Sequence, residues 1–117
     1  MSSIASVAYD EGLADRIRAQ IADQANLTEQ RMFGVLAFLV SGNMAVAASG
    51  QGGLLVRVDP DQTDELVSNT NAKRMEIRGR EMDGWLRLGA DEVGDDSELA
   101  RWVRTGVDYA RSLPAKR

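Results

Sequence analysis

A long apolar stretch, residues 31–58, constrains the fold of this chain more than any other feature. Two short segments interrupt it, Ser-Gly-Asn at residues 41–43 and Ser-Gly-Gln-Gly-Gly at residues 49–53. Glycine and asparagine accept the positive backbone angles of tight hairpin turns, so these segments indicate breaks between strands. The stretch therefore predicts a three-stranded antiparallel meander. Gly34, near its start, predicts a bulge or a bend of the sheet.

The register of the first hairpin follows if Gly42 and Asn43 form its two-residue turn. The predicted cross-strand pairs are Val40 with Ala45, Leu39 with Val46 and Phe38 with Ala47. Such a sheet is apolar on both faces and needs cover on both sides. The cover comes either from the chain's own helices or from another subunit, and the second possibility is a first indication of self-association.

Composition limits the chemistry that the chain can perform. Its 117 residues are enough for one domain, over residues 1–117, and they include neither cysteine nor histidine. Without cysteine there are no disulfides, thiolate metal sites or thiol chemistry, and without histidine the usual general base and the commonest metal ligand are missing. Catalysis through carboxylates or lysine is still possible, but the sequence singles out no such pair. We therefore expect no metal, no cofactor and no enzymatic activity.

Charge and hydropathy indicate the surroundings in which the chain works. The net charge is −4, whereas DNA binding relies on a surplus of lysine and arginine that neutralises phosphates. Direct nucleic-acid binding is therefore not expected. No apolar run reaches the roughly 18 residues of a membrane span, and the N-terminus lacks the pattern of a signal peptide. The expected location is the cytoplasm.

The N-terminal segment predicts a short lead-in followed by a helix. Residues 1–8 are small and weakly patterned, and we expect them to be frayed. Residues 10–25 repeat apolar side chains at every fourth position, which is typical of an amphipathic helix, and Asp10 can cap its first turn. The apolar positions of this repeat are Leu13, Ile17 and Ile21.

Two further helices follow the meander. Asp59 and Pro60 have the pattern of a helix start, and this helix should end near residue 67. Asp95 begins a last helix, which Pro114 ends. One stripe of that helix is apolar or small, at Leu99, Val103, Gly106, Ala110 and Leu113, with Trp102 and Tyr109 beside it.

Between these two helices the sequence predicts two more strands. Residues 73–78 alternate, with Met75 and Ile77 on the inward face. Residues 85–88 form the second strand, with Leu86 and Leu88 inward. Trp85 and Arg87 would then share the polar face with Arg74 and Arg78. The predicted fold class is α+β, in the order helix, three-stranded meander, helix, two strands, helix.

Several segments in the same order resemble the TfoX N-terminal domain family. They are Arg31-Met32-Phe33-Gly34, Gly42-Asn43-Met44-Ala45, Leu55-Val56-Arg57-Val58-Asp59, Gly79-Arg80 to Gly84-Trp85, and Ala110-Arg111-Ser112-Leu113-Pro114. The resemblance covers nearly the whole chain. It implies an α+β fold of the secretion-chaperone-like type, and it defines no catalytic residues.

The resemblance also implies a link to regulation. TfoX, also called Sxy, is a bacterial regulator of natural competence that acts with the cyclic-AMP receptor protein at competence promoters. Those regulators have a second, C-terminal helical domain, and this chain ends where that domain would begin. We therefore expect a stand-alone, single-domain member of the family.

Two functions remain open at this stage. The first is a non-enzymatic protein-interaction or regulatory domain that acts as a homodimer or on a protein partner. Its candidate interface residues are Phe38, Val40, Trp102 and Tyr109. The second is a small-anion site formed by strand arginines beside an aromatic ring, although such arginines usually form a solvated face. Its candidate residues are Arg31, Arg57, Arg74, Arg78, Arg80, Trp85 and Arg87.

Overall fold

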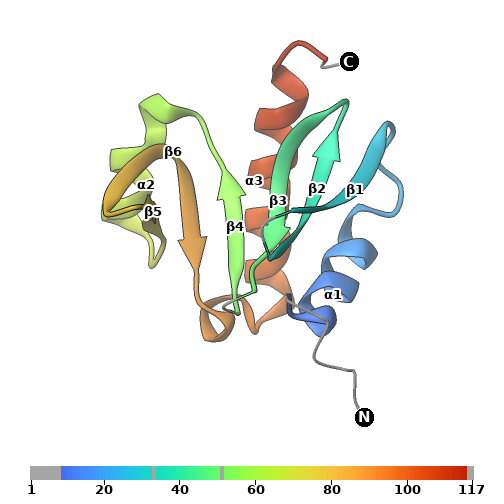
Figure 1. Cartoon of the computed structure of the whole chain (residues 1–117), viewed down its shortest axis with the longest axis horizontal. Helices are drawn as coiled ribbons and strands as arrows, with labels where there is room; N and C mark the ends of the chain where they lie inside the picture. Colours follow the sequence, from blue (N-terminus) through green and yellow to red (C-terminus); the bar gives the residue numbers. More distant parts are fainter. Residues whose placement is uncertain (1–8, 33, 51, 116–117) are drawn as a thin grey trace.

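The chain folds into one antiparallel sheet with helices packed against it. The structure is a computed structural model that describes residues 9–32, 34–50 and 52–115, and the lead-in predicted for residues 1–8 lies outside these ranges. The elements are α1 (Glu11–Ile21), β1 (Leu27–Met32), β2 (Val35–Val40), β3 (Asn43–Ala48), β4 (Leu54–Arg57), η2 (Pro60–Gln62), α2 (Thr63–Asn69), β5 (Lys73–Ile77), β6 (Arg80–Leu88), η3 (Ala90–Val93) and α3 (Asp96–Ser112). The strand order is β1-β2-β3-β4-β6-β5 (Figure 1). The predicted fold class is confirmed.

The meander contains four strands, not three, because the chain turns completely at Gly34. Met32 of β1 pairs with Val35 of β2, so the chain reverses direction between these two residues. Gly34 has a φ of 80°, a value that glycine adopts without steric cost. The bend predicted here is therefore a hairpin turn, and β1 forms one edge of the sheet.

The predicted register of the β2–β3 hairpin is wrong. Ser41 and Gly42 form the turn, with φ values of 50° and 84°, and Val40 pairs with Asn43. Phe38 pairs with Val46, and a bulge follows between Phe38 and Leu39. The turn moves back by one residue because Asn43 is needed in the strand. Its side chain is buried, and its amide nitrogen donates a hydrogen bond to the carbonyl oxygen of Pro114 at 2.9 Å.

Helices α1 and α3 lie on one face of the sheet (Figure 1), and their predicted caps are confirmed. The Asp10 carboxylate accepts from the backbone N–H of Leu13, and that of Asp95 accepts from the N–H of Ser97. Helix α1 ends at Ile21, four residues before the predicted end at residue 25. The face under these helices is the main core, and its largest buried side chains include Trp102, Phe38, Ile17, Leu54 and Leu86.

A glycine allows α3 to approach the sheet closely. A Cβ on Gly106 would overlap the carbonyl oxygen of Ala45 and touch a Val46 methyl group. The helix backbone therefore rests almost directly on β3, and a larger residue at this position would force the helix and the strand apart. This contact fixes the spacing between the helix layer and the sheet.

The β5–β6 hairpin departs from the prediction in which side chains point inward. Arg74 pairs with Leu86, but the next residue, Met75, pairs with Met82, so residues 83–85 bulge out of the register. Leu86 and Leu88 are in the main core, as predicted, whereas Met75 packs against the opposite face. The prediction that Met75 and Ile77 share a face with Leu86 and Leu88 is wrong, because Arg74 is the cross-strand partner of Leu86 and its neighbour Met75 therefore lies on the opposite face.

Candidate functional site

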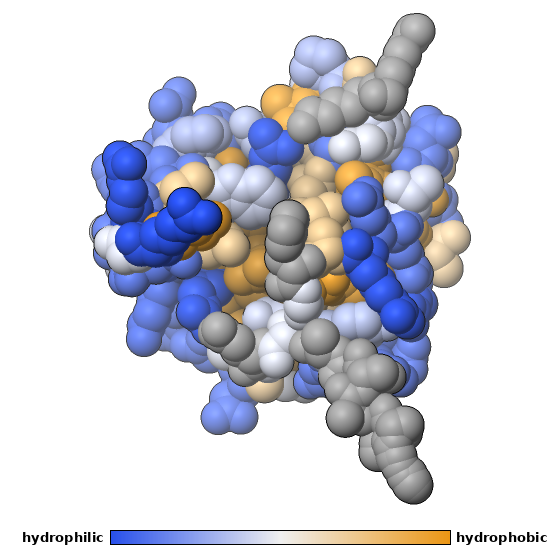
Figure 2. Space-filling view, viewed as in Figure 1, coloured by the Kyte–Doolittle hydropathy of each residue, from blue (hydrophilic) through white to orange (hydrophobic). Residues whose placement is uncertain are grey.

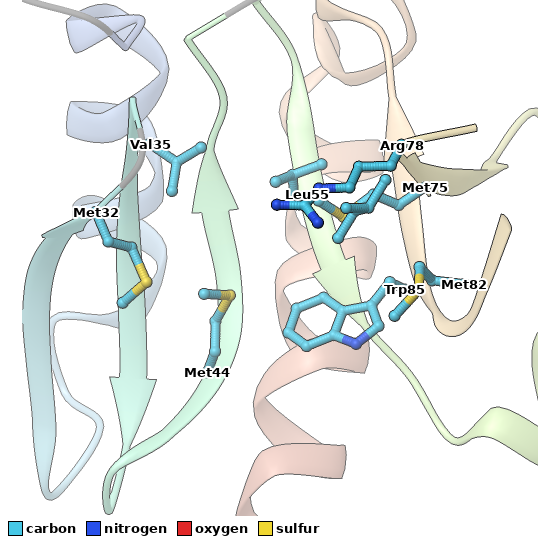
Figure 3. Close-up of a pocket in the computed structure, with 9 residues that line it drawn as sticks. Met32, Val35, Met44, Leu55, Met75, Arg78, Met82 and Trp85 are labelled. Atoms are coloured by element: carbon cyan, nitrogen blue, oxygen red, sulfur yellow. The ribbon is translucent and has the colours of Figure 1, made fainter. Parts of the chain in front are cut away.

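The sheet face opposite α1 and α3 contains an apolar trough of about 660 Å³. Figure 2 shows this face, where apolar residues form a central strip between more hydrophilic flanks. The residues that line the trough are Met32, Val35, Met44, Leu55, Met75, Ile77, Arg78, Met82 and Trp85. Figure 3 shows that they come from both halves of the sheet. We call the whole sheet face that contains this trough the open face.

The trough exists because the sheet has a low floor and long walls. Strands β3 and β4 pair over three residues each, from Val46–Ala48 to Leu54–Val56. Ala37, Ala47 and Leu55 form the floor, a small apolar cluster that is separate from the main core. The side chains that rise beside this floor are larger, and together with the twist of the sheet they leave a hollow between them.

Methionine is the main wall residue. Four of the chain's five methionines line the trough: Met32, Met44, Met75 and Met82. All four are only partly buried. Methionine is unbranched and polarizable, so a methionine-rich surface can adapt to the shape of whatever packs on it. Ile77, which is 45% exposed, adds to this apolar surface.

Arg57 lies between two aromatic rings at the junction of the open face and α3. Its guanidinium carbon is 5.4 Å from the centre of the Trp85 ring and 5.7 Å from that of the Tyr109 ring. Both distances are within the range of a cation–π interaction. Trp85 lines the trough and Tyr109 belongs to α3, so Arg57 connects the two sides of the sheet.

The predicted small-anion residues do not converge on one point. Arg31 pairs with Leu36 of the main core and lies over the Tyr9 ring, on the helix-covered face. Arg74 is engaged by two carboxylates, those of Asp64 and Asp83. The structure therefore separates Arg31 and Arg74 from the other members of the set.

The remaining members of that set belong to the open face. Arg78 and Trp85 line the trough. Arg80 is the cross-strand partner of Ile77, and Arg87 is the partner of Lys73 and Leu55. Cross-strand partners lie on the same face, so Arg80 and Arg87 are spread along the β5–β6 side of the trough.

Three of the four predicted interface residues are in the main core. Phe38 and Val40, on β2, are 0% exposed, and Trp102, on α3, is 2% exposed. Contact between any of the three and a partner would require the core to open. Tyr109 is half-buried and beside Arg57. The alternative prediction was that the chain's own helices cover the sheet. This holds for the face to which Phe38 and Val40 belong.

The trough itself was not predicted from the sequence. Val35, Leu39 and Leu55 alternate with core residues on β2 and β4, and this alternation of apolar side chains on both faces was the available signal. The methionines were a second signal, since their strands are distant in sequence. Only the pairing of β4 with β6 brings Met75 and Met82 to the same side of the sheet as Met32 and Met44.

Charge is distributed unevenly between the two faces of the sheet. On the open face, Lys73, Arg78, Arg80 and Arg87 follow the β5–β6 side of the trough. The strand carboxylates are elsewhere. Glu29 pairs with the core-facing side of β2, Glu76 and Glu81 pair with each other on the far side of β5–β6, and Asp83 is bound to Arg74. The open face is therefore basic although the whole chain has a net charge of −4.

A bidentate surface ion pair also lies away from the trough. Arg18 of α1 donates two hydrogen bonds to Glu29 of β1, at 2.7 and 2.9 Å, and a third to Asp15. The hydrogen bonds from Arg18 hold the pKa of the Glu29 carboxyl below its usual value, although burial partly opposes this shift. The same contacts raise the pKa of Arg18. This pair joins α1 to the edge strand.

Two polar hollows on the helix side are less suited to binding. One, of about 520 Å³, is lined by α2, Glu92, Glu98 and Arg101 among others, but Glu92 already accepts from the N–H of Gly89, and Glu98 is near Arg101. The other measures about 230 Å³, between α1 and α3. In the part of the chain that the structure describes, no cluster of three potential metal ligands occurs. Of these three hollows, the trough is the one with a mainly apolar lining.

Comparison with known families identifies the chain. Residues 19–110 match the TfoX N-terminal domain. The chain belongs to the TfoX N-terminal domain family. The matched region runs from α1 into the last turns of α3, so both faces of the sheet lie within this TfoX N-terminal domain. No curated protein and no solved structure matches the chain. Among the described residues, no helix has the length and apolar character to cross a membrane.

Proposed function

We propose that this TfoX N-terminal domain is a non-catalytic, regulatory protein-interaction domain, and that the open face is its docking surface. The observation that supports the proposal most directly is the methionine-lined trough. It is an apolar hollow of about 660 Å³ on a sheet face that neither α1 nor α3 covers. Apolar patches of this kind on soluble proteins commonly mark interaction sites.

The contrast with the helix-covered face supports the same proposal. That face is filled by buried, mostly branched or aromatic side chains, whereas the open face has flexible methionines and a half-buried tryptophan. Tryptophan and methionine are enriched in protein interfaces, and aromatic anchors contribute much of the binding energy. Trp85, beside Met82 and Arg57, occupies the position of such an anchor.

Site-specific photo-crosslinking tests the proposal. A photoreactive amino acid replaces Met44 on the open face in one variant and Arg104 on exposed α3 in a matched control. Irradiation of cells that express each variant should give discrete adducts from position 44. The variant with the crosslinker at position 104 should give none of these adducts. Equal adducts from both positions, or none from position 44, would contradict the proposal.

The mass of the adduct identifies the kind of partner. A species of twice the mass of the chain would show that the open face binds a second copy, as in a homodimer. A heavier or lighter adduct would show a different protein, which mass spectrometry can then identify. In either case Met44→Glu should abolish the same adduct when the crosslinker is moved to Met75, because the charge enters the shared trough.

A further inference from the structure

We infer that the partner inserts an acidic amphipathic helix into the trough. This inference rests on the proposed function, since it specifies the chemistry of the partner that the open face binds. The apolar stripe of the helix would pack on Met44, Leu55 and Met75. Its carboxylates would face the basic residues of β5 and β6. Shape, charge and the exclusion of other occupants support the inference separately.

The shape of the trough fits one helix. The floor lies deep between the methionine walls, since Leu55 is only 8% exposed there (Figure 3). A convex, cylindrical object fills such a hollow, and the other face of the same sheet already packs α3 in this manner. The six-residue strands β2 and β3 are roughly 20 Å long. A helix with a rise of about 1.5 Å per residue spans this length in about 13 residues.

The charge of the trough favours an acidic partner. Arg78 lines the wall, and Lys73 and Arg80 are exposed on the same side. The opposite side, on β1, presents Gln30 and Thr28, which are neutral. One bank is therefore basic and the other is uncharged. Carboxylates along one flank of an amphipathic helix match this arrangement, because complementary charge sets both orientation and association rate.

A second copy of the chain matches the open face less well. In a symmetric dimer through this face, the same patch of each subunit meets the other. If the two-fold axis crosses the trough, the basic banks face each other, and like charges placed across an interface are unfavourable. If the axis runs along the trough, each basic bank faces the neutral β1 side and has no carboxylate to pair with. A flat lipid surface also fits poorly, because it would rest on the methionine walls and leave the hollow above Leu55 empty.

The experiment uses two synthetic peptides of about 14 residues. Both place leucine at helical i, i+3, i+4 and i+7 spacing, and they differ only in having glutamate or lysine at the flanking positions. Each carries a fluorescent dye, and binding to the purified chain is measured by anisotropy. We expect the glutamate peptide to bind at least about tenfold more tightly than the lysine peptide, with an affinity that falls as salt increases.

Two variants test where the peptide binds. Met44→Glu should weaken the glutamate peptide by at least about tenfold, because it places a like charge in the apolar trough. The double variant Arg78→Glu/Arg80→Glu should also weaken it by about tenfold and should favour the lysine peptide. Arg104→Glu on α3 is the matched control and should leave the affinity unchanged. Circular dichroism melting shows that each variant is folded.

Several outcomes would overturn the inference. They are equal binding of the two peptides, no binding of either, insensitivity to the Arg78/Arg80 reversal, co-sedimentation with anionic vesicles in preference to the peptide, and a dimer in sedimentation that Met44→Glu dissociates. Any of these leaves the proposed function intact if position 44 still gives a specific crosslink. Loss of that crosslink contradicts the proposed function itself, so the two failures are distinguishable.

Discussion

The two faces of this sheet are built by different rules. The face under α1 and α3 is packed by Phe38, Trp102 and other buried side chains, and Gly106 brings a helix backbone against β3. The open face has alanines below and methionines above, with a hollow between them. Alternate residues of the same strands thus form a dense core on one face of the sheet and an adaptable surface on the other.

The difference shows where stability and binding should separate. Truncating a branched or aromatic core side chain lowers the free energy of unfolding steeply, because the cavity left behind does not close. Truncating a half-exposed methionine lowers it much less. Substitutions on the helix-covered face should therefore change the free energy of unfolding, whereas substitutions on the open face should change binding.

Trp102→Ala should have the largest effect on stability. This side chain is 2% exposed, and truncation of a buried tryptophan costs about 3–5 kcal/mol. Trp85→Ala on the open face is the matched comparison and should cost less than half as much, since Trp85 is half-buried. Urea unfolding followed by circular dichroism measures both. Equal losses would show that the open face is as much a part of the core as the other.

Gly106→Ala should come next. The added methyl group would overlap the Ala45 carbonyl oxygen, and overpacking typically costs about 1–3 kcal/mol. A gain in helix propensity of about 1 kcal/mol opposes this loss, so we expect a net destabilisation of up to about 2 kcal/mol. Thr105→Ala, at the neighbouring half-buried position of α3, should stay within about 0.5 kcal/mol. A more stable Gly106→Ala variant would contradict the close contact.

Met44→Ala and Met75→Ala should each reduce stability by less than about 1 kcal/mol, because both side chains are partly exposed. The same two variants should weaken the glutamate peptide by about threefold or more, since each removes part of the wall that contacts it. Chemical unfolding and peptide anisotropy, measured on the same samples, give the two numbers. A large loss of stability with unchanged peptide binding would reverse the assignment of the two faces.

Glu29→Gln should have the smallest effect and a defined pH dependence. The folded-state pKa of Glu29 is lowered, so its contribution is present above the unfolded value near 4.5 and is lost as the pH falls through the folded value. The pair is partly exposed, so the expected loss at pH 7 is about 0.3–1 kcal/mol. Unfolding at pH 7 and at successively lower pH should show the difference shrinking as the pH falls below the unfolded value near 4.5. A difference that stays constant as the pH is lowered would contradict the ion-pair origin.

Local signals in the sequence predicted most of the elements. Asp10, Asp59 and Asp95 all cap helical turns as expected, because a side-chain oxygen that accepts from the first turn is a short-range interaction. The alternating strands and the α+β order also follow from short-range patterns. What the sequence did not predict depends on contacts between distant segments.

The register of the β2–β3 hairpin illustrates this limit. Both Ser41-Gly42 and Gly42-Asn43 are plausible turns, and the contact that decides between them is the hydrogen bond from Asn43 to Pro114, 71 residues away. The trough has the same origin. The bulge in β6 reverses the alternation, and that bulge is accompanied by a hydrogen bond from the N–H of Gly84 to the Thr63 hydroxyl on α2.

Arg57 also has a consequence for how events on this molecule can be observed. Its guanidinium lies between a ring of the trough and a ring of α3, so the environment of Tyr109 depends on where Trp85 holds that charge. The chemical shifts of the Tyr109 ring should therefore respond to an occupant of the trough that does not contact this ring. A ring resonance on the helix side of the sheet should therefore report occupancy of the opposite side.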